Sequence, residues 1–344
     1  MKLVRWSGIA FAAVVLFAAA FIGKETQPVG AQMADAANAL LGTMTAEQKA
    51  KAVFPFDSPE RVKWAFVPKQ DEQKRPTRKG LRLEEMTKEQ QEAVMKLLRT
   101  GTSDSGYKQA VAIMSLESLL AELEGPKGRM VRNTGWYFTS IFGTPGAKGK
   151  WGWRIEGHHF AVNFTIVNGN VQSATPAFFG ANPAEIKAGA NQAKRTLPEV
   201  EDNARALFAS LTDDQKKVAH QSKHFAEIQE IPAAKVGPPV GLAASDMKPE
   251  QRQLLEKLIV AYAERMPDEI AKAQLKVVTD GGFDKVHFAY SGGTKSGEEY
   301  TYRVQGPAFV IEFLNVQADS AGNKANHIHS VWRSLPSDFG LSAR

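Results

Sequence analysis

The chain has 344 residues, of which 43% are hydrophobic and 23% charged, the composition of an ordinary globular protein. It contains no cysteine, which excludes disulfides, cysteine-ligated zinc and a thiol nucleophile. The formal net charge of +6 comes from 43 basic and 37 acidic residues without a basic block, so we expect no nucleic-acid partner.

The first 31 residues have the pattern of an export signal. Lys2 and Arg5 precede an apolar run at 9–22, and Val29-Gly30-Ala31 supplies the small residues expected ahead of a cleavage point. The apolar run is shorter than the ~20 residues of a membrane-spanning helix. We predict a cleaved signal at 1–31, a periplasmic or secreted protein and no membrane span after cleavage; an uncleaved anchor is the alternative.

The rest of the chain resembles itself at four places in the same order, which predicts a tandem, pseudo-twofold repeat. We place one repeat at about 33–180 and the other at about 200–340, with a connector at about 185–198. The offset between matching residues shrinks along the chain, as small loop deletions would produce. The matching segments are 35–41 with 202–208, 45–49 with 212–216, 86–90 with 247–251, and 151–157 with 300–306.

Each repeat is predicted to begin with helices and to continue with strands. Thr45 with Gln48, and Thr87 with Gln90, have the spacing of capping boxes that start helices. The expected fold class is α+β, a single domain over 32–344 in which each half is a helical subdomain followed by an antiparallel β-meander. Further helices are expected at 107–123, 249–262 and 268–275, and strands at 136–141, 151–156, 159–167, 285–290, 300–305 and 308–316.

Four of the seven histidines lie in two short motifs, His158-His159 and His327-Ile328-His329. Residues two apart on a strand share a face, so His327 and His329 point the same way. Such a pair commonly offers two imidazoles to one metal ion. Two surface or hydrogen-bonded core histidines are an equally good interpretation of the isolated pair.

Strand alternation places His159 with Ala161 and Asn163, and His158 on the apolar face of Phe160. A bulge at Gly157 would exchange the two histidines, so both are candidate ligands. In the repeat register Glu312 lies on the same side as His159. A carboxylate in the apolar segment 309–314 is costly unless it binds a metal or forms a salt bridge to Arg154, Arg303 or Arg333.

Neither repeat keeps the histidines of the other: 158–159 correspond to Pro307-Ala308, and 326–329 to 170–173. This complementary pattern predicts one composite metal site of His158 or His159 with His327 and His329. The ion would be zinc, copper or iron. Arg333 shares the strand face of His327 and His329 and is a candidate for binding an anionic substrate.

Four longer motifs carry a resemblance to a known family. They are 151–160 (WGWRIEGHHF), 173–180 (SATPAFFG), 302–312 (YRVQGPAFVIE) and 326–333 (NHIHSVWR) followed by Asp338-Phe339-Gly340. Together they resemble domain-of-unknown-function family 3500 (DUF3500). The resemblance implies one full-length domain, often behind an export signal, and implies no settled activity.

These features leave three functions open. The first is an exported metalloenzyme for a small-molecule substrate, a hydrolase or an oxygen-activating enzyme, with Glu312 as fourth ligand or general base and Arg333 beside it. The second is a non-catalytic metal- or ligand-binding protein of the cell envelope. The third is a structural or interaction protein without a metal. The sequence indicates no oligomeric state.

Overall fold

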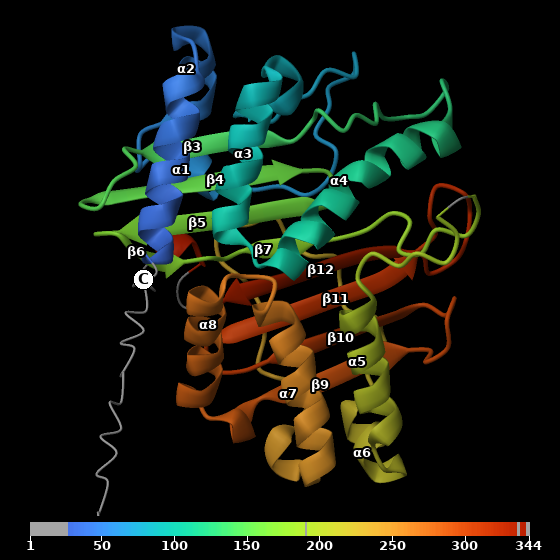
Figure 1. The fold of residues 1–344 in the computed structure, drawn as a ribbon. Coiled ribbons are helices and arrows are strands. Elements are labelled where there is room, and N and C mark those ends of the chain that lie inside the picture. Colours follow the sequence, from blue (N-terminus) through green and yellow to red (C-terminus); the bar gives the residue numbers. More distant parts are fainter. Residues whose placement is uncertain (1–26, 190, 336–337, 342–344) are drawn as a thin grey trace, which may run out of the picture.

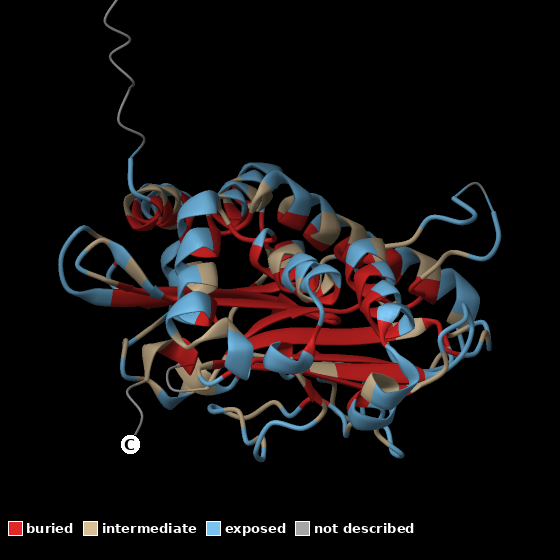
Figure 2. Ribbon diagram, turned by 90° about the horizontal axis from the view of Figure 1, so that it is seen from below, coloured by how far each residue is buried: buried red, intermediate tan, exposed pale blue. Residues whose placement is uncertain are grey.

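The computed structural model describes residues 27–189, 191–335 and 338–341. Within them, eight α-helices lie on one face of a single open sheet, and long loops run beneath the other face (Figures 1 and 2). The protein is therefore an α+β fold with a large, mostly antiparallel sheet.

The helices agree with the predicted starts. Thr45, Thr87 and Thr212 each cap a helix, and in each case a glutamine three residues later completes the capping box. The eight helices are α1 (Val29–Thr43), α2 (Ala46–Ala52), α3 (Lys88–Gly101), α4 (Asp104–Glu124), α5 (Pro198–Ser210), α6 (Asp213–Ala219), α7 (Pro249–Ala263) and α8 (Asp268–Asp280).

The predicted strands form the centre of the sheet, and short strands extend its edges. The order is β1-β3-β4-β5-β7-β12-β11-β10-β9-β8, with β2 beside β3 and β6 beside β5. Only β1 and β3 pair in parallel among the named strands. The strands are β1 (Val53–Phe54), β2 (Leu81–Arg82), β3 (Phe138–Gly143), β4 (Lys150–Gly157), β5 (Phe160–Val167), β6 (Asn170–Ser173), β7 (Ala177–Phe179), β8 (Leu242–Ala243), β9 (His287–Gly292), β10 (Tyr300–Gln305), β11 (Phe309–Gln317) and β12 (His327–Ser334).

The short strand β7 joins the two halves of the sheet. On one side Ala177–Phe179 pairs with β5, and on the other side it pairs with β12. Sequence-distant strands, β5 and β12, are thereby brought within one strand of each other. The segments that carry the two sets of sequence-predicted histidines therefore lie close together in the fold.

Alternate residues of the central strands pack into two separate cores. Phe160, Val162 and Phe164 belong to the main core between sheet and helices. Ala161 and Phe178 belong to a smaller core on the opposite face, which Trp64 and Phe66 cover from below. The sheet is therefore buried on both sides, as Figure 2 shows.

The second face is covered by two loops, 55–80 and 221–241, which we call the cover loops. They are tied to each other: Trp64 Nε1 donates to Ile231 O at 3.1 Å, and the backbone N–H of Phe66 donates to Glu230 at 2.8 Å. Lys69 adds an ion pair with Glu230 at 3.0 Å. Through these contacts the cover loops form one layer rather than two independent segments.

The predicted apolar run at 9–22 lies outside the described residues. Helix α1 begins at Val29, so the expected cleavage point after Ala31 falls within its first turn. There Val29 and Gly30 are buried, and the Val29 N–H donates to Glu269 at 3.0 Å. Among the described helices none combines the length and apolarity needed to cross a membrane.

The approach of α4 to the end of α7 gives a test of the packing between the halves. A Cβ at Gly106 would lie 2.0 Å from the carbonyl oxygen of Arg265, whereas a Cβ at Gly42 in α1 meets nothing within 4 Å. We expect Gly106→Ala to lower the free energy of unfolding by about 1–3 kcal/mol. We expect Gly42→Ala to raise it by about 0.5–1 kcal/mol, since alanine favours helix. Urea denaturation measures both; equal effects would contradict the close approach.

Candidate metal centre

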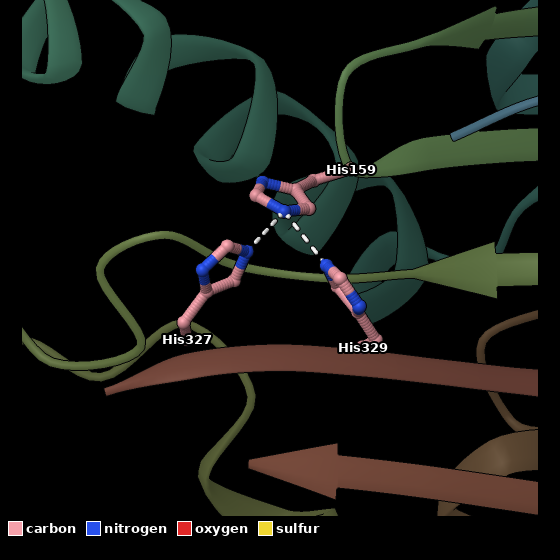
Figure 3. A group of neighbouring side chains, drawn as sticks. All are labelled: His159, His327 and His329. Atoms are coloured by element: carbon pink, nitrogen blue, oxygen red, sulfur yellow. Dashed lines mark hydrogen bonds between the residues drawn. The ribbon is translucent and has the colours of Figure 1, made fainter. Parts of the chain in front are cut away.

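Three histidine side chains from the two halves converge at the centre of the sheet (Figure 3). The Nε2 atom of His159 lies 2.7 Å from Nε2 of His327 and 3.1 Å from Nε2 of His329. All three ligand atoms lie within 4.8 Å of one another. In the described part of the chain, this is the one group of at least three histidine or carboxylate side chains close enough to share an ion.

His327 and His329 occupy the start of β12 and point to the face of the cover loops. Leu314 of β11 pairs with His329, and the register then shifts so that Gln317 pairs with His327. Because the two histidines are two residues apart, they share this face. The sequence-predicted orientation of the pair agrees with the structure.

His159 lies in the tight turn between β4 and β5, not within a strand. Gly157 pairs with Phe160, so residues 158 and 159 form the turn, and His159 has φ 61°. Its N–H donates to Phe66 O and its carbonyl accepts from the Gly180 N–H, both at 2.8 Å. A cover loop and the chain after β7 thus hold the backbone in a left-handed conformation that non-glycine residues seldom adopt.

Gly180 allows this arrangement because the chain passes very close to it. A Cβ there would lie 2.6 Å from the carbonyl oxygen of Ile328 and 3.1 Å from the imidazole ring of His159. The glycine therefore lets the His159 turn and the start of β12 approach each other.

A hydrogen bond orients the ring of His329. Its Nδ1 lies 2.9 Å from a carboxylate oxygen of Glu227, which can only accept, so Nδ1 carries a proton. In the neutral ring of His329, Nε2 is then the nitrogen with the lone pair.

Burial lowers the pKa of two of the three histidines, His159 and His327. The His159 residue is only 4% exposed. Burial, with the neighbouring histidines, lowers the pKa of His159 well below its ordinary value and lowers that of His327 to about 2. At neutral pH these imidazoles are therefore in the uncharged form that binds metals.

The arrangement suits a cation. Nε2 of His159 has either one N–H or one lone pair, so in the absence of an ion it can make a hydrogen bond to only one of its two close neighbours. Nitrogens bound about 2.0–2.1 Å from a tetrahedral ion lie about 3.3 Å apart, close to the spacing of His159 to His329. Among the described residues no carboxylate joins the three nitrogens.

The structure turns His158 away from this group. Its Nδ1 bonds to Glu117 of α4, and Arg132 Nη1 lies 3.2 Å from the same nitrogen. Its ring lies against that of His159, tilted by 31° and with 3.8 Å between ring centroids. Of the adjacent pair, His159 therefore meets His327 and His329, while His158 packs behind it.

Glu312 and Arg333, the expected catalytic residues, have other partners. Glu312 forms an ion pair with Arg303 at 2.7 Å and does not join the histidine group. Arg333 pairs with buried Asp338 at 2.7 Å and donates to the carbonyls of Gln229 and Ile231. In this structure Glu312 links β11 to β10, whereas Arg333 joins the sheet to a cover loop and to the 338–340 turn.

Two neighbours of the group come from the cover loops and were not predicted. Glu227 bonds to His329, and the Phe66 ring lies against His329 with 5.0 Å between centroids. Each is a single residue in an irregular segment, where no periodicity relates it to the histidines. His224 does lie near Glu227 in sequence, yet it contacts Ser291 outside the group.

The contacts of Arg333 predict a stability effect. The Arg333→Met substitution leaves the buried Asp338 carboxylate without its ion-pair partner. We therefore expect the free energy of unfolding to fall by about 3–5 kcal/mol at pH 8. Burial already raises the pKa of Asp338 while Arg333 opposes that rise. Without the arginine the pKa of Asp338 in the folded protein rises further. The loss in the free energy of unfolding should therefore become smaller as the pH falls from 8 to 5. Urea denaturation at both values, with Arg333→Met/Asp338→Asn as the control lacking both charges, measures this; a pH-independent deficit would contradict it.

Comparison with known protein families matches residues 26–341 to DUF3500, a family described as a protein of unknown function. No curated protein and no solved structure matches the chain. The match spans both halves and all three converging histidines. The chain therefore belongs to the DUF3500 family.

Proposed function

We propose that this protein binds one divalent transition-metal ion through Nε2 of His159, His327 and His329 and acts as a metal-dependent hydrolase. The observation that carries the proposal is the convergence of these nitrogens, together with the hydrogen bond between Glu227 and the outer nitrogen of His329. Three imidazoles with an open position are a ligand set of catalytic zinc. An iron site for oxygen chemistry commonly needs a carboxylate ligand, which the group lacks.

Two further features support a catalytic site. Glu227 bonds to the outer nitrogen of His329, the carboxylate–histidine arrangement that orients metal ligands and raises their basicity. Glu227 also accepts from Gln317 at 3.1 Å and its side chain is 44% exposed, so the group lies near solvent. A small-molecule substrate would reach the ion from this side.

A non-catalytic metal-binding role is the second candidate. The Phe66 ring stacks on Phe178 at 4.0 Å, and both rings lie against His329. Such an aromatic wall favours a shielded ion over one that exchanges ligands. The two candidates therefore differ in the accessibility of the fourth coordination position.

We also propose that the domain arose by duplication and that the site is composite, with His159 from one repeat and His327 and His329 from the other. Matching contacts support this. The side chains of Gln48 and Gln90 bond to each other at 2.9 Å, and Gln215 and Gln251 do the same. Both pairs complete capping boxes at matching places in the sequence.

We further propose that the protein is exported by its N-terminal signal. The apolar run at 9–22 supports this, and the buried first turn of α1 favours cleavage ahead of Val29 rather than after Ala31. A cut there would preserve the bond from Val29 to Glu269.

Metal content tests the binding site. We expect close to one ion per chain in untagged protein, and loss of that ion in His327→Ala/His329→Ala because two of three ligands are removed. The control His224→Ala/His287→Ala, outside the group, should keep the ion. Elemental analysis after gel filtration measures it. Absence of metal from every form after reconstitution, with the fold intact, would indicate the structural or interaction role instead.

Metal affinity tests whether Glu227 supports the metal ligand His329. Glu227→Gln should weaken metal affinity by about 10–100-fold, because the His329 ring becomes less basic and less firmly oriented. Glu299→Gln, near His224 and 51% exposed, is the matched control and should have no effect. Competition with a chelator of known affinity measures the metal dissociation constants of both variants.

Activity and coordination separate the two candidates. For a hydrolase we expect metal-dependent turnover of 4-nitrophenyl acetate that is lost in His327→Ala/His329→Ala, with a rate that rises through a pKa near about 7 for metal-bound water. Cobalt-loaded protein should change its visible spectrum on adding azide, because the open position binds the anion. Bound metal with neither turnover nor a spectral change would favour the non-catalytic role.

A further inference from the structure

An open groove of about 610 Å³ lies at one edge of the sheet, in the first half of the chain. Helix α2 and strands β1 and β2 contribute to its walls, and both strands pair with β3 at that edge. None of the three converging histidines lines the groove. Five of the side chains that line it are basic and one is acidic: Lys51, Arg75, Arg78, Lys79 and Arg82, with Glu85.

Three of the basic side chains reach solvent. The side chain of Lys51 is 54% exposed and that of Arg75 is 72% exposed. Lys79 is exposed as well, and it has no hydrogen-bond or ion-pair partner among the described residues. Arg75 pairs with Asp71 at 2.8 Å, but ion pairs as exposed as this one are weak. The three cationic groups are therefore accessible to an anionic ligand.

The other two basic residues are held by carboxylates. Arg78, whose side chain is 5% exposed, lies 3.8 Å from Glu156. Arg82 bonds to Glu85 at 3.0 Å, and Lys51 bonds to the same carboxylate. Burial raises the pKa of Glu85, but the hydrogen bonds from Arg82 and Lys51 outweigh burial and lower the pKa to about 2. The two arginines therefore shape the groove, and the charge open to a ligand is that of the exposed side chains.

The opposite edge of the sheet provides an internal comparison. There β8 pairs with β9 as β2 pairs with β3, and a glycine with positive φ precedes each short strand, Gly241 at 92° and Gly80 at 106°. In the sequence register of the two halves, Lys51 matches Val218, Lys79 matches Val240 and Arg82 matches Ala243. Val218 and Val240 are 53% and 39% exposed. The same local structure thus forms without the cations, so the fold does not require them at the first edge.

The short edge strands favour a sugar chain over a peptide as the ligand. Strands β1 and β2 have two residues each, too few for the row of backbone hydrogen bonds that holds an added peptide strand. Arginine instead offers a planar fork that fits a carboxylate, and lysine offers a point charge. Exposed Ala50 and half-buried Phe54 and Pro76 add apolar surface to the groove, against which the less polar face of a sugar ring can lie.

We propose that this groove binds a carboxylated oligosaccharide, a short chain of uronic acid units. Its carboxylates bond to Arg75, Lys79 and Lys51, and one sugar ring lies against Phe54. The groove shares no lining residue with the histidine group, so the site does not depend on the proposed hydrolase function.

Calorimetric titration with trigalacturonic acid tests the proposal, and its methyl ester, which keeps the sugars but lacks the charges, is the matched ligand. We expect one molecule of the acid per chain. Arg75→Ala/Lys79→Ala should weaken binding of the acid about tenfold, because two exposed ion pairs are lost. The control Lys217→Ala/Lys276→Ala removes the same charge from side chains that are 75% and 72% exposed, and it should preserve the affinity. The ester should bind the wild type and Arg75→Ala/Lys79→Ala with the same reduced affinity.

Several results would overturn the proposal. Absence of binding to the folded wild-type chain excludes the site, and equal binding of acid and ester excludes recognition of the carboxylates. Unchanged affinity in Arg75→Ala/Lys79→Ala, shown folded by circular dichroism, would place the oligosaccharide elsewhere. Hexaglutamate bound as tightly as the acid would indicate an acidic peptide as the ligand. The His327→Ala/His329→Ala variant should bind the acid as the wild type does; loss of binding there would show that the carboxylates occupy the metal centre.

Discussion

The pairing of β7 with both β5 and β12 is the interaction on which the rest of the structure depends. A three-residue strand, Ala177–Phe179, closes two half-sheets into one. Its placement brings the His159 turn next to the start of β12, and Gly180 directly after it keeps the two close. The candidate metal centre is thus a consequence of where one short strand lies.

Buried charge on the second face of the sheet organises the cover loops. Arg154 pairs with Glu60, Arg78 donates to the carbonyls of Ala65 and Gly157, and Arg333 donates to those of Gln229 and Ile231. Each arginine satisfies backbone groups of an irregular segment that has no strand partner. The loops thereby place Phe66 and Glu227 against His329. The charged side chains of this face therefore position the site rather than form it.

Much of the fold could be predicted because local patterns determine it. The capping boxes at Thr45 and Thr87, and the alternation of Phe160, Val162 and Phe164, depend only on neighbours in sequence. The metal group was predicted as far as His327 and His329, since two residues on one strand share a face. The choice of His159 over His158 could not be predicted, because residues 158–159 form a turn, where strand alternation does not apply. Glu312 shows a related limit: its partner, Arg303, and a metal would each justify burying a carboxylate.

The three histidines come from segments 168 residues apart along the chain. Neither segment alone offers more than two of the three converging Nε2 atoms, so the proposed ion would find all three ligands only after β5, β7 and β12 have paired. Loading of the proposed ion would therefore be one of the last events of folding. The ion would be taken from the surroundings in which folding is completed, so the supply of metals there, as well as ligand chemistry, would decide which ion is bound.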